Sequence, residues 1–394
     1  MATKVADALV CAVALACGCA TARPAAPERK FPAVDAHSDI TEQIVYSGYD
    51  FARRHSPDES MEDLPRLREG ALSAQFFAIW VNHDRVPKER FFSEAEHEFV
   101  AAREALAKVP GMALATTARQ VRENEARSIV SALFGVEGGY MLAPGDELEH
   151  LRRFAALGAR YLTLTHTKAS SLGGSSGDAS DGEGLTEQGR MLLQEMWRLG
   201  VVADVSHVSD PLFWDVVRMA KKPVLASHSS SRAIANVPRN LTDAMLRAIA
   251  RTGGAACVNF YAGFLDARVF AEINAAEERL EKRGVDVRKL TIAEERRALV
   301  PELAHVRMPT VSTVADHIVH MVQVAGADHV CLGSDFDGIP LPPVGLEDAS
   351  KLPALSDELL RRGLSEADVR KVFSENVLRV LEANEPAAVA PAPR

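Results

Sequence analysis

The stretch EQGRMLLQEMWRLGVVADVSHVS, residues 187–209, decides the fold, because it holds one complete unit of a repeating pattern. Residues Glu187–Leu199 carry apolar side chains at i, i+3 and i+4 spacing, which predicts an amphipathic helix. The run Val201–Val205 that follows is almost continuously apolar, as in a parallel strand that is buried on both faces. The run leads into Ser206 and His207, so an ionisable side chain follows the strand.

The same unit recurs along the chain. Helical periodicity is found again in Pro211–Met219 and in Ala244–Ala250, which the stretch Leu241-Thr242-Asp243 opens with N-cap chemistry. No G-x-G-x-x-G follows the first strand, so a dinucleotide-binding fold has no support. The alternation predicts one (β/α)8 TIM barrel that spans residues 31–384. Its eight predicted strands are Phe31–Val34, Leu72–Trp80, Ile129–Val136, Arg160–Leu164, Val201–Val205, Pro223–Ala226, Gly254–Asn259 and His329–Gly333.

Two segments depart from a minimal barrel. Ser170–Gly184 is rich in Gly, Ser and Asp and follows the fourth strand, where we expect a flexible loop that covers the substrate. The highly charged segment from Phe264 to about Pro309 lies between strands seven and eight, with helices expected over Ala271–Gly284 and Thr291–Leu303. We expect this helical insertion to cover the barrel mouth or to pack against a second subunit in a homodimer. Most of its charges should be solvated.

The composition excludes several classes of protein. The 394 residues include 45 basic and 54 acidic side chains, a net charge of −9, and 47% are hydrophobic, so the bulk of the chain is globular. The acidic balance disfavours a nucleic-acid partner, which would require a basic surface. Outside the first twenty residues, only Cys257 and Cys331 remain, which is neither a disulfide framework nor a thiolate zinc site. Any metal in the body must therefore be bound by His and carboxylate side chains.

The N-terminal segment has the composition of a targeting signal. Lys4 precedes a short apolar run, Ala8–Ala16, which is about half the length of a membrane-spanning helix. Small residues and Cys17 and Cys19 follow, so residues 1–19 predict a secretory signal that resembles the bacterial lipoprotein type. The alternative is an N-terminal extension with no targeting role. We expect a linker over 20–30, a disordered tail over 385–394, and an exported protein that is periplasmic or anchored to the membrane only by an N-terminal lipid.

Six of the eight predicted strands lead into ionisable side chains. The carboxyl ends of the strands of such a barrel meet at one mouth, where barrel enzymes hold their active sites. Imidazole and carboxylate ligands without thiolates suit zinc or a similar first-row metal, and the number of ligands fits two adjacent metals better than one. The candidate ligands are His37, Asp39, Glu137, His207 and His228, and Asp35, His166, Asp335 and Asp337 lie at equivalent strand ends. We read the remaining candidates as surface or hydrogen-bonded side chains: His55, His83, His97, His150, His305, His317 and His320.

Taken in order, these motifs resemble those of the membrane (renal-type) dipeptidases, peptidase family M19, within the amidohydrolase-like barrels. Each motif is weak alone, but the ordered set covers nearly the whole predicted barrel. The matching stretches include VDAHSD (34–39), DLPRLREG (63–70), GVEGG (135–139), RYLTLTH (160–166), DVSHVS (204–209), SHSS (227–230), PRN (238–240), GSDFDG (333–338) and SENVLR (374–379).

The resemblance implies a role for each matched residue. His37 and Asp39 would bind one zinc ion, His207 and His228 the other, and Glu137 would bridge the two. A hydroxide between the metals would attack the peptide bond of a dipeptide. The implied roles of the other residues are proton transfer for Asp335, oxyanion stabilisation and substrate contact for His166, and capture of the substrate carboxylate for Arg239, with Arg232 as the second choice. Asp337 is expected to shape the turn at Gly338.

Two further functions stay open at this point. A related binuclear amidohydrolase could act on a β-lactam, a cyclic amide or an N-acyl amino acid, but its usual His-x-His pair and bridging lysine are not seen. A non-catalytic binding protein on the same scaffold would be expected to have lost a ligand, and every matched position is kept. The sequence also departs from mammalian members of the family. It lacks the cysteine of their disulfide-linked dimer and their hydrophobic C-terminal tail, and Ser170–Gly184 replaces a segment in which Asn and Trp are usual, which leaves the side-chain preference open.

Overall fold

The structure is a computed structural model that describes residues 31–386. The predicted signal, the linker over 20–30 and all but two residues of the predicted tail lie outside the described residues. Eight parallel strands close into a barrel, because β2 pairs with β1 on one side and with β4 on the other. This confirms the predicted TIM barrel. The strands are β1 (Ala33–Asp35), β2 (Leu72–Ile79), β3 (Met112–Leu114), β4 (Val130–Glu137), β5 (Ala159–Thr163), β6 (Val202–Asp204), β7 (Leu225–Ala226), β8 (Ala255–Val258) and β9 (Val330–Leu332).

The ninth strand, β3, was not predicted. It pairs with the first half of β4, while β5 pairs with the second half of β4 on the same edge. β3 is therefore a short additional strand beside β4, and it is not one of the eight strands that close the barrel. Its three residues are too few to give a periodic signal in the sequence.

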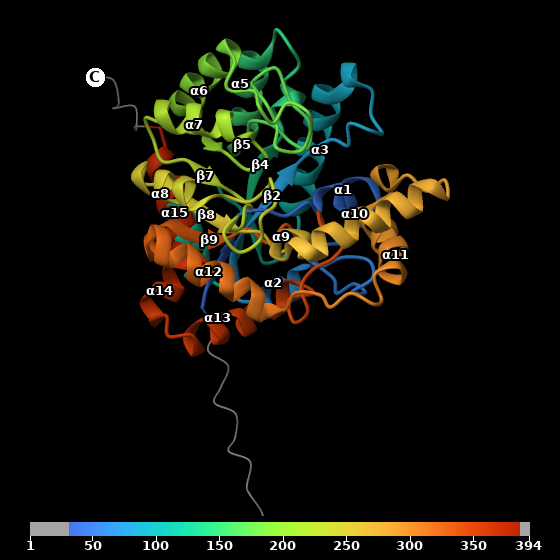
Figure 1. Ribbon diagram of the computed structural model, residues 1–394. Coiled ribbons are helices and arrows are strands. Elements are labelled where there is room, and N and C mark those ends of the chain that lie inside the picture. The colour runs from blue at the N-terminus through green and yellow to red at the C-terminus, as the bar shows by residue number, and fades with distance from the viewer. Residues whose placement is uncertain (1–30, 387–394) are drawn as a thin grey trace, which may run out of the picture.

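Helices surround the barrel (Figure 1). The side chain of Thr186 accepts a hydrogen bond from the first turn of α6, and that of Thr242 accepts one from the first turn of α8. The N-cap predicted within residues 241–243 is thus confirmed and is Thr242. The helices are α1 (Thr41–Tyr46), α2 (Leu64–Glu69), α3 (Phe91–Leu106), α4 (Ala118–Glu125), α5 (Glu147–Leu157), α6 (Glu187–Leu199), α7 (Asp210–Met219), α8 (Asp243–Arg251), α9 (Ala262–Leu265), α10 (Ala267–Lys282), α11 (Ile292–Glu302), α12 (Val311–Ala325), α13 (Leu352–Arg361), α14 (Glu366–Arg370) and α15 (Asn376–Asn384).

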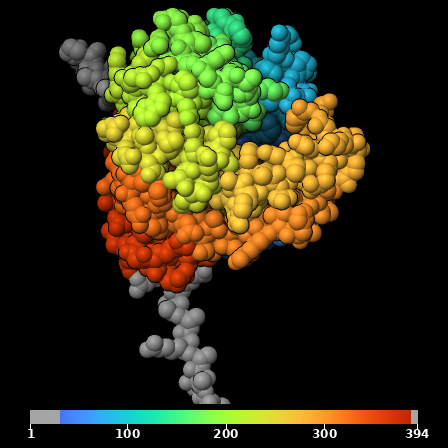
Figure 2. Space-filling model, in the orientation of Figure 1, coloured from blue at the N-terminus to red at the C-terminus, as the bar shows by residue number. Residues whose placement is uncertain are grey.

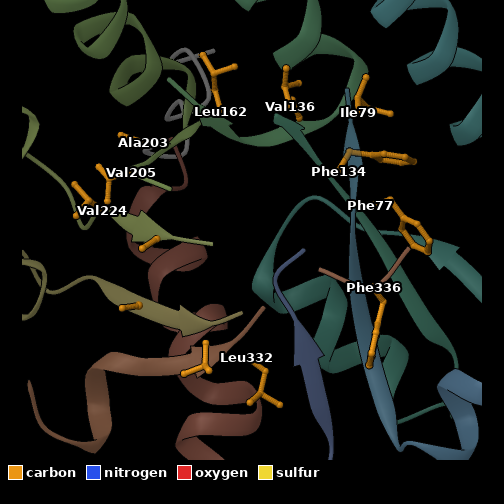
Figure 3. Close-up of a cluster of buried hydrophobic side chains, with 14 of the residues drawn as sticks. Phe77, Ile79, Phe134, Val136, Leu162, Ala203, Val205, Val224, Leu332 and Phe336 are labelled. Atoms are coloured by element: carbon orange, nitrogen blue, oxygen red, sulfur yellow. The ribbon is translucent and has the colours of Figure 1, made fainter. Parts of the chain in front are cut away.

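Successive residues of each strand point to opposite sides, so the barrel has two apolar shells. The outer shell lies between strands and helices and includes Phe77, Phe134 and Leu162 (Figure 3). The inner shell fills the barrel and includes Phe76, Leu133 and Tyr161. Apolar residues of α15 belong to the inner cluster, and α15 contacts β6, β8 and β9. This helix thus packs on the apolar interior and leaves the opposite mouth for polar side chains.

The two cysteines of the barrel form a disulfide, which we did not expect from a sequence without a disulfide framework in the barrel. Cys257 on β8 lies directly opposite Cys331 on β9 in the register of the two strands. The pairing could not be read from the sequence, because 74 residues separate the two positions and only the strand register brings them together.

The segment between β8 and β9 contains α9, α10 and α11, which project to one side of the barrel (Figure 1). We call residues 262–302 the roof. It has a small apolar core of its own, built around Val269, Ile273 and Leu299. Figure 2 shows the roof in yellow and orange, beside a hollow that it shares with blue and green segments of the chain.

Among residues 31–386, the longest helices are charged and amphipathic, and none has the length and apolar character required to cross a membrane.

Candidate metal centre and active site

The predicted ligands converge on the carboxylate of Glu137, the last residue of β4. One oxygen of Glu137, Oε1, lies 3.1 Å from Nε2 of His207, 3.2 Å from Nε2 of His228 and 3.4 Å from Nε2 of His37. These four side chains are buried. Nε2 of His37 also lies 3.6 Å from Oδ1 of Asp39. The barrel thus brings together all five residues that the sequence predicted as ligands.

Short connections place these side chains at the mouth. Ser209 caps α7 two residues after His207, so the chain must turn between β6 and the helix within a few residues. His207 makes this turn with a φ of 66°, and Asp335 makes the equivalent turn after β9 with a φ of 64°. Residues other than glycine rarely adopt this left-handed conformation, and its cost is typical of functional sites.

Asp335 lies at the same mouth with its two oxygens in different surroundings. Oδ2 accepts a hydrogen bond of 2.8 Å from Nδ2 of Asn259, whereas Oδ1 lies 3.9 Å from Nε2 of His37. Burial raises the pKa of Asp335 well above its usual range, against the effect of His37. Gly338 passes so close to Asp39 and Asp335 that a Cβ atom there would overlap both carboxylates. Asn259 held no signal in the sequence beyond its position at the end of a predicted strand.

His166 follows β5 and lies 3.7 Å from Glu137 through its Nε2 atom. Burial lowers the pKa of His166 to about 4, so the ring is neutral at pH 7. Its Nδ1 atom is buried and has no hydrogen-bond partner within the described chain. A neutral ring of this kind can donate a hydrogen bond without carrying a charge into the site.

The structure separates the two candidate arginines. Arg232 is held by both oxygens of Asp210 at 2.7 and 2.8 Å. Arg239 donates instead to Oγ of Ser229 and to the backbone carbonyl of His228, both at 3.0 Å, and stacks on the Phe264 ring. Within residues 31–386, Arg239 has no carboxylate partner within ion-pair distance, and its buried Nε has no hydrogen-bond acceptor. Burial lowers the pKa of Arg239 to about 10, so it stays charged.

The remaining candidates have structural contacts. Asp337 accepts hydrogen bonds from the backbone N–H of Met61 at 2.9 and 3.1 Å, so its side chain holds a neighbouring loop. Asp35 accepts from the backbone N–H of Ser334 at 2.8 Å and so joins the ends of β1 and β9. His317 is buried with both ring nitrogens hydrogen-bonded, as expected. His83 is hydrogen-bonded to Thr167 but lies nearer the site than predicted, with its ring 5.8 Å from that of His166.

The segment Ser170–Gly184 is not the loose cover that its composition suggested. The backbone N–H of Ser176 donates to the carbonyl of His207 at 2.8 Å, and Oγ of Ser175 donates to the carbonyl of His166 at 2.5 Å. The N–H of Ser209 donates to the carbonyl of Gly174. The glycines and serines let this segment pack tightly against the backbone of two site histidines, which it supports.

The charges and donors of the site fit divalent metals. Three overlapping groups of side chains could each hold an ion: His37, Glu137 and His228; Glu137, His166 and His207; and His37, Asp39 and Asp335. Nε2 of His37, Oδ1 of Asp39 and Nδ1 of His207 are buried without a hydrogen-bond partner. Burial raises the pKa of Asp39 to about 6, with a further contribution from Glu137. Buried carboxylates and ring nitrogens that lack partners are the groups that a cation would satisfy.

A cavity of about 230 Å³ opens above this centre. Asp39, Glu137, His166, His207 and Asp335 line its base. Its other walls come from the loops after β8 and β9 and from the roof, which contribute Tyr261, Phe264, Ile339 and Glu295. Sequence reasoning missed Tyr261 and Glu295. Tyr261 could have been noticed because it follows a predicted strand, but Glu295 lies in a charged helix with no distinguishing signal.

Two other residues were missed because they lie below the mouth. Tyr161 and Asp204 occupy inward-facing positions of β5 and β6 and are fully buried. The signal for Asp204 was present, since a lone carboxylate interrupts the apolar run Val201–Val205.

Known proteins resemble this chain over nearly its whole length. An uncharacterised dipeptidase of Schizosaccharomyces pombe is 29% identical over 385 residues, which cover 91% of this chain and 84% of the relative. The crystal structure of the dipeptidase AC, a metallopeptidase of family M19, has a TM-score of 0.74 at 28% identity and covers 91% of this chain and 100% of its own. A metallopeptidase from Rhodobacter sphaeroides, solved with a phosphinate mimic of the dipeptide L-Ala-D-Ala, has a TM-score of 0.72 at 27% identity, with 90% and 100% covered.

The family assignment rests on the sequence as well as on the shape. The membrane dipeptidase family, peptidase family M19, matches residues 23–392, which includes every ligand candidate described above. The barrel, the buried His and carboxylate cluster and the dipeptidase relatives agree with this match. The chain therefore belongs to the membrane dipeptidase family, peptidase family M19, and is a metallopeptidase that hydrolyses peptide bonds.

Proposed function

We propose that this chain is a dipeptidase that works with two zinc ions, held by His37, Asp39, His207 and His228 and shared through Glu137. The observation that carries the proposal is the convergence of three imidazole nitrogens within 3.4 Å of one carboxylate oxygen of Glu137. When bound, such a metal pair activates a water molecule near neutral pH and polarises the carbonyl of the scissile bond.

The side chains around this centre would divide the remaining work. The hydrogen bond from Asn259 fixes Oδ2 of Asp335, which leaves Oδ1 to accept a proton from the attacking water and to pass it to the departing amine. His166 would donate a hydrogen bond to the oxygen of the tetrahedral intermediate. In the net reaction, water adds across the C–N bond, the carbonyl carbon gains the oxygen and the leaving nitrogen gains the proton.

Arg239 would select short substrates. Its guanidinium lies beside the ligand His228 and lacks a carboxylate partner, as described above, so it can bind the C-terminal carboxylate of a dipeptide. A longer peptide would place a neutral amide, not a carboxylate, at this position. The phosphinate complex of the R. sphaeroides relative makes L-Ala-D-Ala a reasonable first substrate to test.

A metal and substrate screen tests the proposal. Purified protein should contain about two zinc ions per chain and should hydrolyse dipeptides, with D-residues tried at the C-terminal position. Tripeptides, N-acyl amino acids, a β-lactam and a cyclic amide form the comparison set. Full activity after exhaustive chelation, or faster hydrolysis of the comparison set than of any dipeptide, would overturn the proposal.

The arginine is tested by the substrate carboxylate itself. Wild-type protein should prefer a dipeptide to the same dipeptide with an amidated C-terminus. Arg239→Ala should lower kcat/KM for the free acid by about 10–10²-fold, since a charge-assisted bidentate contact is worth ~1.5–3 kcal/mol, and should leave the amide almost unaffected. Equal losses for both substrates would place Arg239 in a structural role.

We also propose that the protein is exported, anchored only by an N-terminal lipid if at all. The signal-like composition of residues 1–19 supports this proposal, as does the Cys257–Cys331 disulfide, because disulfides persist in oxidising compartments. Fractionation of cells that express the full chain, with Cys17→Ser and Cys19→Ser variants, would test it. Retention of unprocessed wild-type protein in the cytoplasm would contradict it.

A further inference from the structure

Two of the ligand histidines are held from below by polar side chains in the barrel interior. The hydroxyl of Tyr161 lies 2.8 Å from Nδ1 of His37. The hydroxyl of Ser227 lies 2.7 Å from Nδ1 of His228 and donates to Oδ2 of Asp204 at 2.6 Å. All these side chains are buried. In both cases the contact is made by the ring nitrogen that faces away from Glu137.

The direction of the Ser227 contact follows from the number of protons. Asp204 accepts four hydrogen bonds, from Oγ of Thr163, from the backbone N–H groups of Ser206 and Ser227, and from the Ser227 hydroxyl. The single proton of that hydroxyl is therefore used, and the Ser227 oxygen must accept from Nδ1–H of His228. This leaves the lone pair on Nε2, the atom that faces Glu137 and His207.

The position of Tyr161 is fixed by packing. Its ring lies 5.4 Å from the ring of Phe76. Gly135, on the neighbouring strand, leaves the space that the ring occupies, because a Cβ atom at Gly135 would overlap it. The hydroxyl has no second hydrogen-bond partner within the described chain, so its hydrogen bond is made to His37 alone.

His207 provides the internal comparison. Its Nδ1 atom is buried but has no hydrogen-bond partner among the described residues. The three histidines that face Glu137 thus have three different supports: a phenol, a serine linked to a carboxylate, and none. Such outer contacts fix the tautomer and orientation of a metal ligand, and their loss lowers metal affinity by about 10–100-fold.

We propose that Tyr161 and the Asp204–Ser227 pair are positioning residues, each for a different one of the two metal positions. Tyr161 orients His37, and Asp204 acts through Ser227 to orient His228. The inference rests on the proposed function, since it requires that these histidines bind metal. It adds that the two positions can be weakened separately.

The test removes one hydroxyl at a time. Tyr161→Phe and Ser227→Ala are compared with the wild type for zinc retained per chain during titration with a competing chelator, and for the absorption spectrum of the cobalt-substituted protein. Each variant should lose one metal ion at a chelator concentration about 10–100-fold lower than the wild type requires, and should keep the other ion. The two variants should lose different cobalt bands, and Ser227→Thr, which keeps the hydroxyl, should restore the wild-type titration.

Matched controls separate positioning from folding. Tyr140→Phe removes a hydroxyl that bonds to the carbonyl of Val81, and Ser356→Ala removes one that bonds to the carbonyl of Pro353. Neither control should change metal retention. Wild-type zinc retention in both test variants, or equal loss of both metals in each, would overturn the inference while leaving the proposed function standing. A wild-type protein that binds no zinc would overturn both.

Discussion

The floor and the roof of the active-site cavity are built in different ways. The floor consists of side chains at the ends of barrel strands, and its members are buried and held by at least one neighbouring strand. The roof, residues 262–302, has a small core of its own and is joined to surrounding loops by contacts that include hydrogen bonds of 3.0 Å from Arg296 to the carbonyls of Pro340 and Pro57. The difference suggests that the floor carries the chemistry, while the roof adjusts which substrates reach it.

The largest effect should come from neutralising the centre of the floor. Glu137→Gln keeps the size of the side chain but removes the charge that three histidines share. The variant should bind zinc poorly and so lose several kcal/mol of metal-dependent stabilisation of the transition state. We therefore expect kcat/KM to fall by about 10³-fold or more, together with loss of bound zinc. The exposed Glu187→Gln is the control. If Glu137→Gln kept the zinc content of the wild type, the proposal that Glu137 bridges the two metals would be wrong.

A smaller loss of activity is expected from a substitution that displaces the carboxylates of the floor but removes no ligand. Gly338→Ala would push a methyl group into the carboxylates of Asp39 and Asp335. A displacement of about 1 Å can cost about 10²-fold in kcat. Gly182→Ala is the matched control, because no atom lies within 4 Å of its Cβ position. Similar kcat values for the two variants would show that the floor tolerates movement.

The junction of floor and roof should affect stability more than catalysis. His317 of α12 accepts from the N–H of Ser231, after β7, and donates to the carbonyl of Leu265 in the roof, both at 3.1 Å. His317→Phe would leave both backbone groups unpaired and should lower the free energy of unfolding by about 1–3 kcal/mol at pH 7. Urea unfolding of the variant and of the exposed His305→Gln control measures this loss. If His317→Phe matched the control, the junction would contribute nothing.

The same histidine gives this contribution a pH dependence. Burial lowers the pKa of His317 from 6.5 to about 4, so the unfolded chain takes up a proton at a pH where the folded chain does not. The stability that His317 provides is therefore complete above pH 6.5 and falls as the pH drops towards 4. The difference in unfolding free energy between wild type and variant should shrink over that range. A constant difference would contradict this reading.

The smallest effect belongs to the roof itself. Glu295 lines the cavity, and burial together with Glu277 raises its pKa to about 8. Above pH 8 its carboxylate is ionised and should favour a dipeptide with lysine over one with norleucine by about fivefold, or ~1 kcal/mol. The preference should weaken as the pH falls below 8 and should be absent at all pH values in Glu295→Gln. Glu278→Gln, on the solvent side of α10, should keep it.

The floor could be predicted from the sequence because its placement follows from topology. Parallel strands deliver their carboxyl ends to one mouth, so His37, Glu137, His207 and His228 had to meet once the eight strands were recognised. The contacts that required spatial register could not be predicted. Tyr161 reaches His37 across the barrel, and Cys257 meets Cys331 only in the paired strands. The loop Ser170–Gly184 was misjudged because a Gly- and Ser-rich composition suits tight backbone packing as well as mobility.

The Cys257–Cys331 disulfide has a consequence for the integrity of the molecule. The two cysteines flank the roof and α12 in the sequence, so the bond closes a covalent ring that contains all of α9, α10, α11 and α12. A protease that cut once within this ring would leave a single covalent body, which would separate into two pieces only after reduction. A cut or a substitution in the roof would therefore leave β8 and β9 covalently joined beneath Asn259 and Asp335.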